Sequence, residues 1–275
     1  MANEVVYEAN RAKFASLPGY VRSVWRHRQL AINLARAELK ASHQDTLLGQ
    51  LWQLLNPVLL AVSYLFLFEV VASRPGGLNF LAFLLMGLFP FYFTRDAAVR
   101  GAGSVIGGGW LVANTRLPRA ILPLASVLFA ARSFAAACVV YVPVHLVAGQ
   151  GATWALLALP LVFALQALFN LGLALVLAVA SVFVRDVRTA LPYGVRIWLY
   201  ISPVLYAFDD VPDNLEPVLI INPLTSFLTP VHQILSEGRW PSGWWMFGAF
   251  AWSLGTLLAG TLFFAAKEHE FAFRL

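Results

Sequence analysis

Long apolar segments, separated by short polar ones, occupy most of the chain after residue 50. A membrane helix needs about 20 predominantly apolar residues to cross the hydrocarbon layer. The segments are continuous and lack the regular alternation of barrel strands, so the pattern predicts helices. We predict six membrane spans, at residues 51–73, 79–94, 121–148, 152–183, 189–208 and 244–266.

A seventh apolar segment, residues 218–235, contains Pro223 and Pro230. Each proline removes a backbone donor and clashes with the preceding helical turn. Such breaks are tolerated at membrane depth only where protein or water satisfies the freed backbone groups. We therefore expect re-entrant outer helices, and no full crossing, in the region 209–242 between spans five and six.

The first 50 residues are polar and rich in Arg, and they are predicted to be a cytoplasmic segment. Their apolar positions recur at helical spacing with basic residues between them, which is typical of an amphipathic helix on the inner membrane face. A partly disordered leader is the alternative. The apolar positions of this N-terminal helix are Val21, Val24, Trp25, Ile32, Ala35 and Leu39. Residues 51–275 are predicted to form the six-span transmembrane domain.

The distribution of charge predicts the orientation. If the N-terminus is cytoplasmic, only Arg74 and Arg239 among the basic loop residues lie outside, and the outer loop after span five is acidic. Cytoplasmic segments of membrane proteins carry an excess of Lys and Arg, so both termini are expected in the cytoplasm. The basic residues on the inner side are Arg11, Lys13, Arg22, Arg26, Arg28, Arg36, Lys40, Arg95, Arg100, Arg116, Arg119, Arg185, Arg188, Lys267 and Arg274.

Composition supports the same class. Hydrophobic residues make up 60% of the chain and charged residues 12%, and the mean hydropathy is +0.72. A soluble domain carries about a quarter charged residues. The chain is therefore predicted to be an all-α, multi-pass membrane protein. Its net charge of +5 is explained by inner loops that face anionic membrane lipids, so no nucleic-acid partner is expected.

Motifs of common enzymes are absent from the sequence. No Lys follows a Gly, so the chain has no phosphate-binding loop of the P-loop ATPases. It also lacks the HExxH, GxSxG and CxxC patterns, and its only cysteine is Cys138. We expect no catalytic residue, no metal site and no cofactor on this chain.

Charges inside predicted spans are costly and normally mark function. Arg132 lies early enough in a long span to reach the inner interface. Arg196 lies further into span five, so an aqueous path beside it is one of two equal alternatives. The spans hold no series of carboxylates that would carry a proton or sodium cycle, which disfavours a secondary transporter.

Several short segments together resemble a known family. They are "TLLGQLWQLLNPVLL" (46–60), "NTRLPRAILPLASV" (114–127), "FVRDVRTALPYG" (183–194), "SPVLY" (202–206) and "INPLT" (221–225). In this order, the segments are similar to those of the membrane (permease) subunits of ABC-2 exporters, in particular the Wzm-type polysaccharide and polyol-phosphate branch. One departure is "SHQDT" (42–46), where the family often has a basic–aromatic pair.

The resemblance implies partners. Such permeases act as homodimers, and each copy binds a separate P-loop ATPase subunit, so two ATPase copies carry the ATP and Mg. By this resemblance, short inner segments form the coupling contacts to the ATPase. The alternative is that these inner segments are ordinary loops whose positive charges only set the orientation of the protein in the membrane. The coupling residues implied are Asn114, Arg116, Arg119, Arg185, Asp186 and Arg188.

The cargo of the resembled family is a lipid-linked glycan. We expect the chain to form a channel that moves such a polymer to the outer face of a bacterial inner (plasma) membrane. Composition typical of a GC-rich genome favours a cell-wall galactan over an O-antigen or a teichoic acid. The alternatives are an ABC-2 permease for a small molecule or drug, and a membrane-embedded glycan-modifying enzyme. Candidate channel-lining residues, with packing aromatics as the alternative, are Tyr64, Phe68, Arg196, Trp198 and Tyr206.

Overall fold

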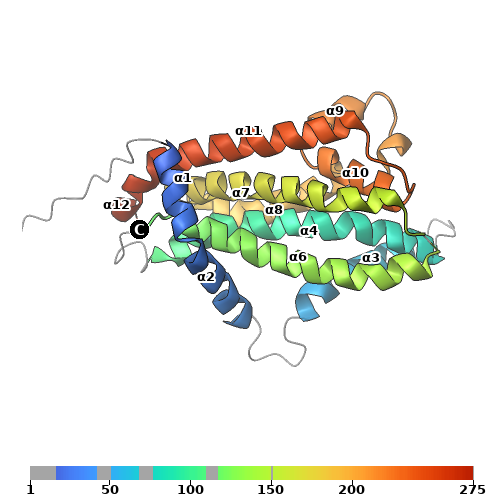
Figure 1. Cartoon of the computed structure of the whole chain (residues 1–275), viewed down its shortest axis with the longest axis horizontal. Helices are drawn as coiled ribbons and strands as arrows, with labels where there is room; N and C mark the ends of the chain where they lie inside the picture. Colours follow the sequence, from blue (N-terminus) through green and yellow to red (C-terminus); the bar gives the residue numbers. More distant parts are fainter. Residues whose placement is uncertain (1–16, 42–50, 68–76, 110–116, 150, 275) are drawn as a thin grey trace, which may run out of the picture.

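The computed structural model describes residues 17–41, 51–67, 77–109, 117–149 and 151–274, and these residues form helices joined by turns. Four long helices run side by side along the molecule (Figure 1). Each is long and apolar enough to cross a membrane, the third together with the short helix η2 (Trp154–Ala158) that precedes it. The four are α4 (Gly77–Gly107), α6 (Ile121–Val147), α7 (Leu159–Phe183) and α11 (Gly243–Lys267).

The other two predicted spans are shorter helices. They are α3 (Leu51–Phe66) and α8 (Asp186–Ile201), each of 16 residues. At 1.5 Å per residue, 16 residues extend about 24 Å, which is less than the hydrocarbon thickness of about 30 Å. The all-helical membrane class is therefore confirmed, with four candidate spans in the described part of the chain, whereas six spans stay a prediction.

The fifth predicted span, at 189–208, differs from the helix observed. The helix α8 begins at Asp186 and ends at Ile201, and Ser202 has extended backbone angles. Pro203 explains this end, because a proline disfavours helical angles at the residue before it. The segment 202–206 therefore forms turns and is not the last part of a span.

Span two, predicted at 79–94, was expected to be followed by an inner loop up to residue 119, and the first half of this loop is wrong. The helix α4 continues for 31 residues, past the predicted end at Thr94, and it includes Arg95 and Arg100. Small residues hold this extension against α7: a Cβ added at Gly101 would lie 2.5 Å from the Cβ of Ala174. The charges suggested a loop, but close helix packing extends the helix through them.

The apolar segment with two prolines forms two short helices, α9 (Glu216–Ile221) and α10 (Thr225–Leu235). The break at Pro223 is confirmed, because this residue lies between them. Pro230 instead lies inside α10, where no break occurs. All eleven residues of α10 are buried, and the helix packs against α4, α7, α11 and η2. Surrounding helices make a proline tolerable at such a position.

The N-terminal segment contains two helices where one was predicted. They are α1 (Leu17–Arg26) and α2 (Arg28–Ala41), which meet at His27. On α1, Trp25 is 68% exposed and Arg28 stacks on its ring at 5.0 Å. The helix α2 instead packs on α6. Its buried side chains are Ala31, Ala35 and Leu39.

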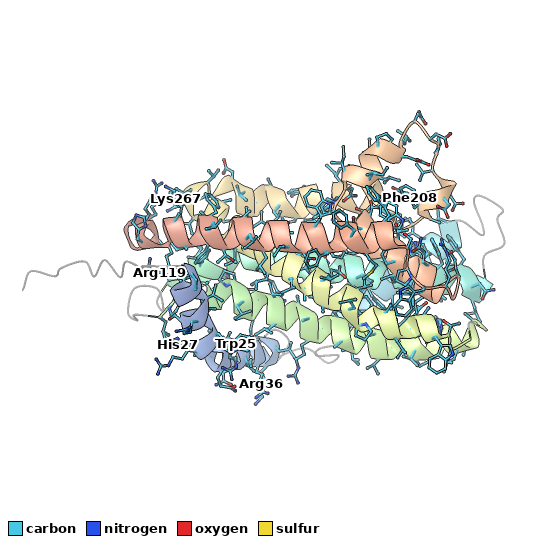
Figure 2. All side chains as sticks on the ribbon, turned by 45° about the horizontal axis from the view of Figure 1, so that its top comes forward. Trp25, His27, Arg36, Arg119, Phe208 and Lys267 are labelled. Atoms are coloured by element: carbon cyan, nitrogen blue, oxygen red, sulfur yellow. The ribbon has the colours of Figure 1, made fainter. Side chains whose placement is uncertain are left out.

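The two ends of the bundle differ in charge. Arg119 and Lys267 lie at the same end as Trp25 and Arg36 of the N-terminal helices (Figure 2). The opposite end, toward Phe208, carries the acidic residues of the segment 209–216. This separation agrees with the charge pattern that predicts one cytoplasmic and one outer end. We call the first the basic end.

Candidate coupling surface and channel face

Three segments far apart in the chain meet at the basic end through Glu268, which follows α11. The Tyr20 hydroxyl of α1 donates a hydrogen bond of 2.7 Å to Oε2 of Glu268. Arg119, which precedes α6, donates to the backbone carbonyl of the same residue. Burial raises the pKa of the Tyr20 hydroxyl, and the Glu268 carboxylate raises it further, so Tyr20 stays a donor. Arg119, a predicted coupling residue, is thus half-buried and hydrogen-bonded within the chain.

The turn between α7 and α8 carries the other three described coupling candidates. Arg185, Asp186 and Arg188 are all exposed. The turn is short: the Val184 N–H still bonds back into α7, and the Val184 carbonyl accepts from Val187 in α8. Asp186 is the first residue of α8, where the helix dipole favours a carboxylate. Backbone hydrogen bonds therefore tie this turn to both helices.

A cavity of about 540 Å³ lies beside this turn. Arg185, Arg188 and Arg274 line it and give it a positive charge, which Glu270 beside Arg274 partly offsets. Arg274 stacks on Phe183 at 4.2 Å, and its Nη2 lies 3.8 Å from Oε2 of Glu270. Such a site suits an acidic side chain of another protein. We call it the arginine groove. From the sequence, Arg274 was predicted to lie on the inner side but was not among the predicted coupling residues. Its charge was the only feature in the sequence that pointed to a role at this site.

Three predicted site residues lie outside the described residues: Asn114, Arg116 and Phe68. Their roles stay predictions. The structure therefore tests the position of only one of the two predicted coupling segments in full, the turn between α7 and α8.

The described channel candidates lie on α3, on α8 and just after α8. The Tyr64 hydroxyl donates to the Tyr200 hydroxyl at 3.0 Å, which joins the two helices. Arg196 is exposed on α8, and it forms no ion pair with any residue that the structure describes. Both helices also leave large apolar side chains exposed, including Leu59, Val62 and Phe66 on α3 and Tyr193, Ile197, Tyr200 and Ile201 on α8.

Asn222 joins the segment 221–225, to which it belongs, to the segment 202–206. Its Oδ1 accepts from Nε1 of Trp198 at 2.8 Å and from the Leu224 N–H at 3.1 Å. Its Nδ2 donates to Oγ of Ser202 at 2.9 Å. Trp198 is therefore half-buried and hydrogen-bonded, while Tyr206 is half-buried and donates to the Tyr200 carbonyl. Sequence reasoning missed Asn222, whose only signal was an amide in an apolar segment.

Comparison with known proteins indicates the family of this chain. Residues 28–235 match the family described as ABC-2 type transporter. The O-antigen export system permease protein RfbA of Myxococcus xanthus is 30% identical over 254 residues, which are 92% of this chain and 97% of that protein. Two proteins of the same name from Klebsiella pneumoniae are 28% and 27% identical over 211 residues, 76% of this chain and 81% of theirs.

The matched region includes α2, the turn between α7 and α8, and both segments that Asn222 joins. The relatives are named as permease proteins, which agrees with the expectation of a transport subunit that is not an enzyme. The match also confirms the resemblance on which the partner predictions depend. This chain belongs to the ABC-2 type transporter family.

Proposed function

We propose that this chain is the channel-forming permease subunit of an ATP-driven exporter of lipid-linked polysaccharide. It acts as a homodimer with two copies of a separate P-loop ATPase, which bind the ATP and Mg. The polymer passes from the cytoplasmic to the outer face of the bacterial inner membrane. The helices α3 and α8 are spans one and five of six, both termini are cytoplasmic, and α9 and α10 are the outer re-entrant helices.

The main observation in support of this proposal is that Arg196 on α8 is exposed. A charged side chain facing lipid is expensive, so arginines within spans face a water-filled cavity or a partner. Arg196 is the eleventh residue of the 16-residue helix α8, too far from the basic end to reach it without strain. An aqueous path along α8 removes this cost. Large exposed side chains on α3 and α8 supply the rest of such a surface.

A second copy of the chain closes this path. The helices α3 and α8 are too short and too exposed to form a complete wall alone. Pairing the same face of two copies gives a closed two-fold assembly, the commonest symmetry of oligomers. The tyrosines on this face have rings that stack on the apolar faces of sugars without requiring one particular sugar, which suits a long polymer.

The arginine groove supports a partner at the basic end. Its three cationic side chains attract an acidic group, and the short turn beside it joins α7 to α8. ATPase motion applied at Asp186 and its neighbours thus reaches the channel helix directly. Since this chain has no phosphate-binding loop, the energy must come from such a partner.

The names of the relatives favour a polysaccharide of the O-antigen type as cargo, because they are O-antigen export permeases. The names therefore favour a polysaccharide over a small molecule or drug as the cargo. The galactan that composition favoured stays a prediction, as does the identity of the lipid carrier.

Inverted membrane vesicles test the proposal. Vesicles containing this chain and its ATPase should take up lipid-linked O-antigen polymer when ATP is added, and a hydrolysis-dead ATPase is the control. Arg196→Leu should abolish uptake while the protein level is unchanged, whereas Arg132→Leu on α6 should retain it. Uptake of small amphipathic dyes with no polymer transport would contradict the proposal and favour the drug permease.

A further inference from the structure

Polar side chains of three helices meet at the face that α3 and α8 expose. The Tyr64 hydroxyl of α3 donates a hydrogen bond of 3.0 Å to the Tyr200 hydroxyl of α8, and both helices pack against α4. On α4, Cζ of Arg95 lies 4.7 Å from the centre of the Tyr92 ring. Tyr92 also lies within electrostatic reach of Tyr64 and of Arg196 on α8. We call these five residues the tyrosine–arginine cluster.

Helical spacing groups the members of this cluster. Arg196 and Tyr200 are four residues apart on α8, so they share one face of that helix. Tyr92 and Arg95 are three residues apart on α4 and share a face in the same way. The cluster is open on one side: Arg196 is exposed, Tyr200 is 54% exposed, and the Arg95 side chain is 39% exposed. A ligand on this face can therefore contact them.

The cluster lies deep in the proposed membrane domain. Arg196 is ten residues after Asp186, the start of α8, which corresponds to about 15 Å. Arg95 is twelve residues before Gly107, the end of α4, which corresponds to about 18 Å. Both distances start at the basic end, and each is about half of the hydrocarbon thickness of about 30 Å. Guanidinium groups at such a depth are costly and mark a functional site.

The described residues leave part of the charge of the cluster unbalanced. Oδ1 of Asp96 lies 3.8 Å from Nη1 of Arg95 and offsets one of the two positive charges. Arg196 has no ion-pair partner among the residues that the structure describes. Within the same part of the chain, the hydroxyl groups of Tyr92 and Tyr200 donate no hydrogen bond. One positive charge and two hydroxyl donors are thus left for a ligand.

We infer that the tyrosine–arginine cluster binds a phosphate or diphosphate ester halfway across the membrane, namely the anionic group that links the transported glycan to its lipid. The planar guanidinium of Arg196 binds two phosphate oxygens, and Arg95 adds a second positive charge. Tyr92 and Tyr200 donate from their hydroxyl groups. The hydroxyls of an uncharged sugar polymer require no net positive charge. This inference rests on the proposed channel along α8 and adds that an anionic group passes through it.

The depth of the cluster favours the cargo over a phospholipid of the surrounding bilayer. A phospholipid also carries a phosphate, but its headgroup lies at the membrane interface. The cluster is about 15–18 Å from the basic end, so a headgroup would have to cross half of the hydrocarbon layer to reach it. A lipid-linked glycan that is exported must bring its anionic link past this level.

Binding of prenyl probes to the purified full chain in detergent tests the site. Farnesyl diphosphate and farnesol differ only in the anionic group, and the ATPase is omitted because its nucleotide site binds diphosphates. Microscale thermophoresis should show that farnesyl diphosphate binds about tenfold more tightly than farnesol, or more. Arg95→Gln and Arg196→Gln should each remove most of this difference. The matched control, Arg132→Gln, changes an exposed arginine eleven residues after the start of α6 and should keep it.

Two conservative variants test the chemistry of the contacts. Tyr200→Phe removes one hydroxyl donor at an exposed position, so it should weaken farnesyl diphosphate binding about threefold to tenfold and leave farnesol binding unchanged. Arg196→Lys keeps the charge but loses the planar fork, so its loss should be smaller than that of Arg196→Gln. Unchanged binding in all cluster variants, or an equal loss in Arg132→Gln, would overturn the site. Thermal unfolding of each variant without probe separates binding from folding.

Two further measurements separate the source of the phosphate from the proposed function. Dihexanoyl-phosphatidylglycerol should bind equally to the wild type and to Arg196→Gln, and a loss as large as that of farnesyl diphosphate would overturn the assignment to the cargo. Uptake of lipid-linked polymer by vesicles tests export independently. Uptake by a chain that does not distinguish farnesyl diphosphate from farnesol would overturn this inference and leave the proposed function. Diphosphate binding that depends on the cluster, without any uptake, would overturn the proposed function and leave the site.

Discussion

Replacing Gly172 by alanine tests the contact between α7 and α11. A Cβ at this position would lie 2.4 Å from the backbone carbonyl of Thr256 and 2.5 Å from the backbone nitrogen of Leu257. Gly260 faces it from α11, where a Cβ would lie 2.4 Å from the Gly172 carbonyl oxygen. Ordinary van der Waals contact begins at 3.4 Å, so α11 must move away by about 1 Å.

The size of the effect follows from what obstructs the new methyl group. The obstructing atoms are backbone atoms of a long helix, so no side-chain rotation relieves the overlap. Overpacking of this kind costs about 1–3 kcal/mol. Replacing Gly by Ala inside a helix returns about 0.5–1 kcal/mol, because the unfolded chain loses freedom. From the middle of both ranges, we expect Gly172→Ala to lower the free energy of unfolding by about 1 kcal/mol, and by no more than about 2.5 kcal/mol.

Unfolding of the purified chain by titration with a denaturing detergent measures this change. Gly255→Ala on α11 is the matched control, because a Cβ there meets no atom within 4 Å. It should be neutral or stabilising by up to about 1 kcal/mol. The double variant with Gly260→Ala should cost less than the sum of the single variants, since both substitutions crowd the same contact and one displacement of α11 relieves both overlaps. Equal stability of Gly172→Ala and Gly255→Ala would refute the close approach of these helices.

Three further predictions concern coupling, packing and topology. Asp186→Ala should leave membrane levels and orientation normal but weaken co-purification of the ATPase by a few kcal/mol of binding free energy, and wild-type export in this variant would make the turn an ordinary loop. Asn222→Leu should lower thermal stability by about 1–3 kcal/mol, because it leaves buried donors unpaired, and an unchanged unfolding temperature would contradict this. In a Cys138→Ala background, a cysteine at Asp213 should react with an impermeant maleimide from outside and one at Ala272 only from inside. Outside labelling at Ala272 would contradict the six-span topology.

Much of the fold was predictable from residue pattern and charge. The apolar segments predicted the long helices α6, α7 and α11 closely, because a helix in lipid must be apolar along its whole length. The helix α4 was predicted too short, because Arg95 and Arg100 suggested a loop. Arg100 is accommodated by contacts distant in the chain: its Nη1 lies 2.7 Å from Oε1 of Glu38, and its guanidinium lies over the ring of Phe129.

The candidate sites were predictable only in part. The turn at Arg185 and Asp186 was found from its charges within an apolar region, and the structure places both on the surface as a coupling contact requires. Arg274 was not assigned to this region, because nothing in local sequence indicates that the end of the chain returns to the turn. Asn222 was missed for the same reason, since its partners Trp198 and Ser202 lie 24 and 20 residues earlier.

The sequence by itself determined that this protein is helical and membrane-embedded, that its basic residues belong at one end, and that it resembles the ABC-2 permeases. These properties depend on hydropathy, charge and short motifs, which each segment carries independently of the others. Only the tertiary structure decided where α4 ends, how the arginine groove is assembled, and that residues of α3, α4 and α8 form the tyrosine–arginine cluster. These features arise from contacts between residues far apart in the chain, and such contacts exist only after the helices have packed.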